Sequence, residues 1–142
     1  MGGARAVTIL ASADGHRALM LLAALTTGLG CNPFGPRPEA FVIRVDSISA
    51  PLSVGPTENL IIRFSGTIGP SGCYRLTEVT TGRTQTHFEV RFNGEFRNVL
   101  CTQDPSHLAH DIELAPPFRD PFVIRALQPS GPALERSVRI QQ

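Results

Sequence analysis

The chain has 142 residues, 42% of them hydrophobic and 18% charged, and its formal net charge at pH 7 is +1. This length accommodates one domain and a short additional segment. Its arginines are spread singly along the chain, whereas a nucleic-acid-binding protein needs clustered cations to displace counterions from phosphates, so nucleic acid is not expected as a partner.

Residues 1–30 have the composition of a signal peptide. Positively charged residues precede the uncharged run ALMLLAALTTGL at 18–29, and small residues follow it. A helix needs about 20 apolar residues to span a bilayer, so a run of about a dozen is too short for a stable span and fits the apolar region of a signal peptide. The alternative is a buried helix of the folded domain, which the prolines that follow would detach at once.

Cys31 stands directly after this run, and the segment resembles a bacterial lipoprotein signal peptide. In that family a small residue precedes a cysteine that is acylated and becomes the mature amino terminus; Gly30 and Cys31 match these two positions. Gly28 occupies the position where the family usually has leucine, and Leu29 is one place late. Gly28 and Gly30 also satisfy the small-x-small rule of ordinary signal cleavage, which would leave Cys31 unmodified. The resemblance implies export and a lipid anchor on Cys31 in the membrane of the bacterial cell envelope, with simple secretion as the alternative.

The number of cysteines favours the lipid anchor. Exported domains tend to pair their thiols, so an odd cysteine needs an explanation. Cys73 and Cys101 can pair, which leaves Cys31 single at the position that acylation would use. A single acyl chain would anchor the protein only marginally at a membrane, whereas two or more acyl chains attached at Cys31 would hold it stably.

The segment from Cys31 to residue 40, CNPFGPRPEA, contains three prolines and a glycine. Such a sequence forms neither a helix nor a central strand. Residues 31–40 are therefore predicted to be a stiff, extended tether.

From residue 41 to 142 the chain alternates between apolar and polar residues, which is typical of strands with one buried face. Strands are predicted at 41–48, 59–66, 73–79, 86–92, 107–114, 121–127 and 137–140. Turn-forming sequences stand at 69–72 (GPSG), 80–83 (TTGR), 93–94 (NG) and 129–132 (PSGP). About seven short strands predict an all-β, two-sheet antiparallel sandwich. This domain resembles an immunoglobulin-like or fibronectin-like sandwich, and small bacterial lipoproteins of unknown role share the plan of tether, sandwich and internal disulfide.

The predicted Cys73–Cys101 disulfide limits the path of the chain. Two cysteines can be bridged when their Cα atoms lie within about 7 Å. If 73–79 and 86–92 form a hairpin, a further full strand would carry Cys101 to the far end of the sheet. We therefore expect the bridge together with a loop at 93–100, and two buried free thiols are the alternative. Neither cysteine lies in a CxxC motif, so zinc binding through cysteine is not expected.

His107, His110 and Asp111, in the sequence HLAHD, are three potential metal ligands. On a helix the two histidines would share a face, but on the predicted strand they point to opposite sides of the sheet. Zinc needs three or four convergent ligands. No metal site is therefore expected here, and a metal-dependent hydrolase that uses these residues is the less favoured possibility.

Other polar and apolar motifs fit structural roles. His87, Glu89 and Arg91 are in phase on one strand, which is typical of the solvent face of a sandwich. Ser71 lies in a turn without the G-x-S-x-G pattern of a nucleophile elbow. The proline-rich and aromatic segment 116–122 is expected to pack over one end of the sandwich, and an exposed contact patch is the alternative.

These observations predict a non-catalytic envelope lipoprotein, not an enzyme, that has no cofactor. Its sandwich would serve as a binding or structural module, and an envelope protein or a glycan would contact its loops or a sheet edge. The membrane itself would be a partner through the lipid on Cys31. The alternative is a small exported hydrolase inhibitor that uses the loop 93–100 as a preorganised wedge.

Overall fold

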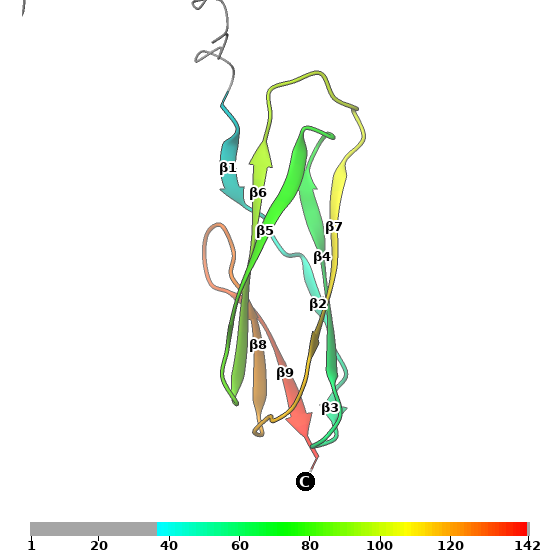
Figure 1. Ribbon diagram of the computed structural model, residues 1–142, viewed down its shortest axis with the longest axis vertical. Helices are drawn as coiled ribbons and strands as arrows, with labels where there is room; N and C mark the ends of the chain where they lie inside the picture. The colour runs from blue at the N-terminus through cyan, green and yellow to red at the C-terminus, as the bar shows by residue number, and fades with distance from the viewer. Residues whose placement is uncertain (1–36, 142) are drawn as a thin grey trace, which may run out of the picture. The chain divides into compact units, whose positions relative to one another are not determined.

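The computed structural model describes residues 37–141, and their regular elements are nine β-strands (Figure 1). The strands are β1 (Glu39–Val42), β2 (Ser47–Ser49), β3 (Ser53–Val54), β4 (Leu60–Gly69), β5 (Tyr74–Arg83), β6 (His87–Phe96), β7 (Ser106–Leu114), β8 (Phe122–Ala126) and β9 (Leu134–Ile140). The predicted all-β, immunoglobulin-like sandwich is confirmed. Within residues 37–141 no helix is long and apolar enough to cross a membrane. The predicted signal peptide and Cys31 lie outside the described residues.

The strands form two sheets. The larger sheet has the order β1-β6-β8-β9-β3, and β5 pairs with the other edge of β6; the smaller sheet has the order β2-β4-β7. Along one edge of β6, residues 93–96 pair with β1 and residues 87–90 pair with β8. Two pairings, β3 with β9 and β6 with β8, are parallel, whereas the alternation alone predicted antiparallel sheets.

The hydrophobic core lies between the sheets. Alternation along β4 buries Leu60, Ile62 and Phe64 completely, and these side chains face those of the larger sheet. The rings of Phe64 and Phe92, from the two sheets, have centroids 5.3 Å apart. Among the described residues no polar or charged residue is buried, so the sandwich is held mainly by apolar packing.

The predicted strand 41–48 is divided, because the chain crosses from one sheet to the other within it. The Ile43 N–H donates to the Phe92 carbonyl in the larger sheet at 2.8 Å, and the Asp46 N–H donates to the Ser65 carbonyl in the smaller sheet at 2.9 Å. Val45 lies between these two attachments and is only 3% exposed. We call residues 43–46 the crossing segment. It separates β1 from β2.

Strand β1 begins at Glu39, two residues before the predicted start of the domain at residue 41. Its pairing with β6 joins Glu39 to Phe96 and Val42 to Asn93. The end of the segment predicted as tether is therefore part of the sheet.

Two of the predicted turns are wrong, because the hairpin of β5 and β6 is longer than its sequence suggests. Both 80–83 and 93–94 lie within strands, and the chain reverses at Thr84–Thr86 instead. There the Thr84 hydroxyl accepts hydrogen bonds from the backbone N–H groups of Thr86 at 3.2 Å and His87 at 3.1 Å. A serine or threonine hydroxyl can thus replace the usual glycine signal of a turn.

Gly94 has a packing role rather than a turn role. A Cβ atom at this position would lie 2.8 Å from Cζ of Phe41 and 3.0 Å from the carbonyl oxygen of Arg75. Glycine therefore lets the ring of Phe41 lie directly on β6. The other two predicted turns, 69–72 and 129–132, are confirmed as connections, and Gly131 in the second has a φ of +80°.

The segment 116–122 packs over one end of the sandwich, as predicted. Phe118 is 8% exposed and Phe122 is fully buried, and their ring centroids are 5.0 Å apart. The Arg83 guanidinium lies 5.1 Å from the centre of the Phe118 ring and donates to the carbonyls of Ala115 and Pro117. These contacts close that end of the core.

Candidate functional site

The described chain starts at one end of the sandwich, which we call the entry end. Glu39, the first residue of β1, is paired with Phe96, the last residue of β6. The β4–β5 turn and the β6–β7 connection, residues 97–105, lie at this same end, whereas β9 ends at the opposite one (Figure 1). We call residues 97–105 the tied loop.

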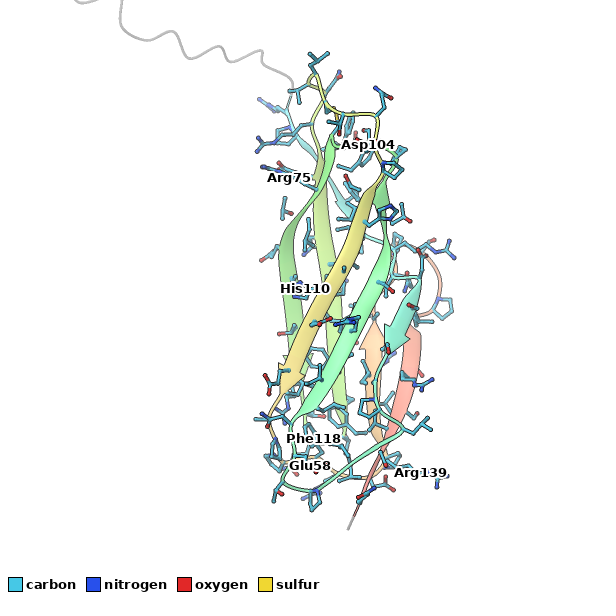
Figure 2. The ribbon with its side chains drawn as sticks, turned by 90° about the vertical axis from the view of Figure 1, so that its right-hand side faces the viewer. Glu58, Arg75, Asp104, His110, Phe118 and Arg139 are labelled. Atoms are coloured by element: carbon cyan, nitrogen blue, oxygen red, sulfur yellow. A yellow bond between two sulfur atoms is a disulfide. The ribbon has the colours of Figure 1, made fainter. Side chains whose placement is uncertain are left out.

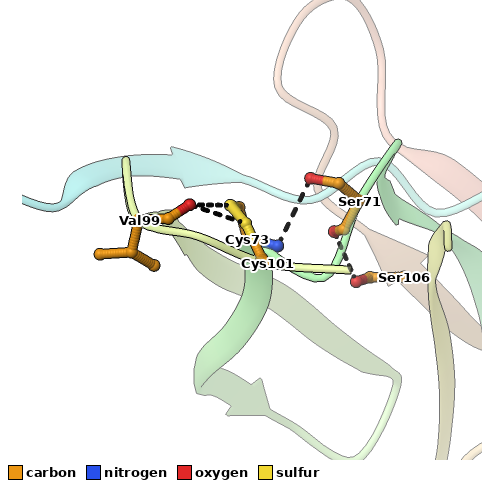
Figure 3. Close-up of a disulfide and its surroundings, with 5 residues drawn as sticks. All are labelled: Ser71, Cys73, Val99, Cys101 and Ser106. Carbon is orange, nitrogen blue, oxygen red and sulfur yellow. Dashed lines mark hydrogen bonds between the residues drawn. A yellow bond between two sulfur atoms is a disulfide. The ribbon is translucent and has the colours of Figure 1, made fainter. Parts of the chain in front are cut away.

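A disulfide joins the tied loop to the β4–β5 turn. Cys73 and Cys101 are bridged, with their Cα atoms 5.5 Å apart (Figure 3). The expected loop at 93–100 needs correction, because β6 continues to Phe96 and pairs it with Tyr74. The longer hairpin brings the end of β6 back beside Cys73, and the loop that reaches the bridge starts only at Arg97.

Backbone hydrogen bonds fix the tied loop on both sides of the disulfide. The Arg97 N–H donates to the Cys73 carbonyl at 3.1 Å, and the Gly72 N–H donates to the Thr102 carbonyl at 3.1 Å. Within the loop, the Val99 N–H donates to the Arg97 carbonyl at 2.9 Å, which closes a three-residue turn. The carbonyl oxygen of Val99 lies 3.3 Å and 3.1 Å from the two bridged sulfur atoms (Figure 3).

Ser71 contributes to this attachment as a turn residue. Its carbonyl accepts a hydrogen bond from the Ser106 hydroxyl at 2.9 Å, and its own hydroxyl accepts one from the Cys73 N–H at 3.4 Å (Figure 3). Both interactions hold the β4–β5 turn against the start of β7. They agree with the structural role predicted for Ser71.

The tip of the tied loop exposes two adjacent apolar side chains. Val99 is 57% exposed and Leu100 is fully exposed. The other large apolar side chains that are mostly exposed, among the described residues, are Leu52 and Ile61, which lie singly on other parts of the domain. Val99 and Leu100 lie within the predicted loop 93–100, where no exposed apolar pair was expected. In the sequence, two adjacent apolar residues next to a bridged cysteine, outside any run of alternating apolar and polar residues, were the signal that could have identified this pair.

A group of charged residues surrounds the base of the tied loop. Glu95 accepts hydrogen bonds from the guanidinium groups of Arg75 at 2.7 Å and Arg97 at 2.5 Å, and its side chain is 16% exposed. Partial burial acts to raise the pKa of Glu95, but the hydrogen bonds and charges of the two arginines outweigh it and hold this pKa below its usual range. The carboxylate therefore stays ionised and fixes both arginines at the edge of the sheet.

The residues of HLAHD do not converge. His107 is exposed, whereas His110 points to the opposite face of β7, is half-buried, and lies edge-on to the Phe92 ring with centroids 5.5 Å apart. Asp111 receives two hydrogen bonds from Arg63, at 2.8 Å and 2.7 Å, on the outer face of the smaller sheet. Figure 2 shows this outer face. The bond from Arg63 is the main cause of a lowered pKa at Asp111. The predicted opposite orientation of the two histidines is confirmed, and residues 37–141 contain no cluster of three or more potential His, Cys, Asp or Glu metal ligands.

The polar residues of β6 belong to cross-strand networks on the outer face of the larger sheet. Glu89 lies 3.4 Å from Arg125 on β8, and Arg125 also donates to Glu135 on β9 at 2.9 Å. His87 is within hydrogen-bond distance of the Thr84 hydroxyl, 2.9 Å from Nδ1. These contacts, and the exposure of Arg91, agree with the solvent-face role predicted for His87, Glu89 and Arg91.

No known protein family matches this chain, and neither its sequence nor its fold has a significant match among curated proteins and solved structures. Its function is therefore inferred from its own residues. The tied loop is the candidate site, because it combines covalent attachment with an exposed apolar tip.

Proposed function

We propose that this chain is an exported lipoprotein whose sandwich is a non-catalytic binding or structural module of the bacterial cell envelope. In this proposal residues 1–30 direct export and Cys31 carries the lipid. The Cys73–Cys101 bridge supports an exported location, because disulfides form and persist in oxidising compartments. Because Cys73 and Cys101 pair with each other, Cys31 is the one remaining cysteine in the sequence.

The observation that carries the proposal is the apolar tip of the tied loop. Val99 and Leu100 are held in solvent by a disulfide and by backbone hydrogen bonds. Exposed apolar side chains on a rigid loop favour recognition, because they lose little conformational entropy on binding. They offer neither a nucleophile nor a proton donor, so they support a contact surface rather than a reaction centre.

A partner protein would have a second place to bind on the free edge of β5. This ten-residue strand pairs with β6 on one side, and within residues 37–141 no strand pairs with its other edge. Free edges accept an added strand from another chain. The irregularity between Leu76 and Glu78 and the charged side chains of Arg75 and Glu78 limit indiscriminate pairing at this edge.

Mass spectrometry of the mature amino terminus tests the proposal. The protein is purified from membranes of a bacterial host, and the expected terminal residue is acylated Cys31. The control is Cys31→Ser, which we expect in the soluble fraction. An intact, unprocessed chain inside the cell, with all of its thiols open to alkylation, would contradict the proposal.

A small exported hydrolase inhibitor is the second candidate. One observation favours it: the disulfide and the Arg97–Cys73 and Gly72–Thr102 hydrogen bonds preorganise the loop, as an inhibitory wedge requires. The test is inhibition of a panel of proteases and glycoside hydrolases by the purified protein, with Leu100→Ser and Cys73→Ser as comparisons. Inhibition that both substitutions abolish would favour this candidate, and no inhibition of any enzyme would eliminate it.

A further inference from the structure

The place where the tether joins the domain determines which end of the sandwich lies near the proposed lipid. Glu39 begins β1 and is paired with Phe96, and Arg97 follows immediately as the first residue of the tied loop. The base of the tied loop and the start of the folded domain are therefore neighbours. A lipid attached before Glu39 approaches the loop before it approaches the opposite end.

The tether is short. Eight Cα–Cα steps, through the seven residues 32–38, separate the lipid-bearing Cys31 from Glu39 at the start of β1. Even fully extended they span at most about 28 Å. The ten residues of β6 alone extend about 33 Å from the entry end towards the opposite end. A lipid on Cys31 thus keeps the entry end within about 28 Å of its attachment point, whereas the opposite end is not limited in this way.

We infer that the tied loop is a second membrane contact, in which Val99 and Leu100 enter the lipid surface beside the acylated Cys31. This inference rests on the lipid anchor of the proposed function. The two side chains are too few to bind a membrane alone, but the anchor keeps them at a high effective concentration beside it. The loop is already fixed by the disulfide, so little conformational entropy is lost when its tip is inserted.

The formal charges at the entry end cancel, which distinguishes this contact from electrostatic adsorption. The charged residues there are Arg37, Glu39, Arg75, Glu95, Arg97 and Asp104, three of each sign. Anionic lipid headgroups attract clustered cations, and that attraction falls with salt. Contact through Val99 and Leu100 is instead apolar, so it persists at high ionic strength.

Tryptophan fluorescence tests this inference, because the natural chain contains no tryptophan. Leu100→Trp places a single reporter at the tip of the tied loop. Leu52→Trp is the matched control, because Leu52 is 75% exposed and its carbonyl is bonded to Arg139 near the end of β9. Each mature, acylated variant is added to phosphatidylethanolamine–phosphatidylglycerol vesicles, with and without bromine atoms on the acyl chains. Vesicle flotation measures the anchor separately.

We expect both variants to float with the vesicles. Only Leu100→Trp should shift its emission to shorter wavelength and lose fluorescence in brominated vesicles, at low and at high salt. Flotation with no quenching at Leu100→Trp would leave the anchor standing and overturn the loop contact, and the loop would then be free for a protein partner. Equal quenching of both variants would also overturn it, because the entry end would not be the inserted one. Failure to float would refute the anchor of the proposed function.

Discussion

The side chain of Gln128 makes the hydrogen bonds that a neighbouring strand would otherwise make to the crossing segment. Substitution of Gln128 tests that role. The Val45 N–H donates to Oε1 of Gln128 at 3.2 Å, and Nε2 of Gln128 donates to the Val45 carbonyl at 3.1 Å. Val45 is 3% exposed and lies between the two sheets. The backbones of β6 and β4 hydrogen-bond its neighbours Ile43 and Asp46. One side-chain amide thus occupies both backbone groups of a buried residue.

We expect Gln128→Leu to destabilise the fold by about 2 to 4 kcal/mol. Each buried backbone group without a partner costs about 1 to 3 kcal/mol, and two groups of Val45 are affected. The lower part of the combined range applies because the two hydrogen bonds are only partly buried, so water reaches the edge of the site. Urea unfolding followed by circular dichroism measures the change in the free energy of unfolding.

Two further variants make the measurement specific. Gln128→Glu keeps an acceptor for the Val45 N–H but has no donor while it is ionised, so its deficit should shrink below about pH 4.3, where the carboxyl group becomes protonated. Gln141→Leu is the control, because Gln141 makes one exposed side-chain hydrogen bond to Ser53. Equal free energies of unfolding for Gln128→Leu and Gln141→Leu would refute the role assigned to Gln128.

Three other perturbations have defined outcomes. Replacing both Cys73 and Cys101 by alanine should lower the free energy of unfolding by about 3.6 kcal/mol, the chain-entropy value for a sequence separation of 28. Denaturant titration of this variant beside the disulfide-bonded protein measures the loss, and a clearly smaller loss would contradict this value. The lowered pKa of Glu95 stabilises the folded state above the ordinary glutamate pKa of about 4.3, and this stabilisation is lost as the pH falls through the folded-state pKa. Unfolding at about pH 7 and pH 3 should therefore show that Glu95→Gln is destabilising mainly at the higher pH; a deficit independent of pH would exclude the linkage. Gly72→Ala places a Cβ atom 2.5 Å from Oγ1 of Thr102, an exposed side chain that must then change its rotamer, and should cost about 0.5 to 1.5 kcal/mol. Thermal unfolding of the double variant with Thr102→Ala should recover most of this cost.

Alternation identified the strands that have one face on the core. Leu60, Ile62 and Phe64 are fully buried as predicted, and Arg63 between them is exposed and bonded to Asp111. This pattern is readable because a strand with one face in the core and one in solvent needs a period of two. The crossing segment keeps the same alternation although it belongs to neither sheet over its full length, since Ile43 and Val45 still face inward. Burial alone could not reveal the change of sheet.

Asn93 and Gly94 show why the hairpin was predicted too short. An Asn-Gly pair is a strong turn signal, because both residues tolerate left-handed backbone angles. Here the Asn93 side chain bonds across the sheet to Glu78 at 3.3 Å and Thr80 at 3.2 Å, and Gly94 makes room for Phe41. A glycine required by a ring from a distant strand has the same appearance in the sequence as one required by a turn. The pairing of the cysteines was predictable from their number, but the direction of Val99 and Leu100 depended on where β6 ends.

The parallel pairing of β3 with β9 joins an early segment of the described chain to its last strand. Residues 53–54 pair with Arg139 and Ile140 of β9, and β9 is itself joined to the sheet through β8, which pairs with β6. A chain that is threaded through a membrane from its amino terminus therefore cannot complete its sheets until nearly all of it has emerged. If the chain is exported as proposed, this late closure keeps the sandwich incomplete during translocation.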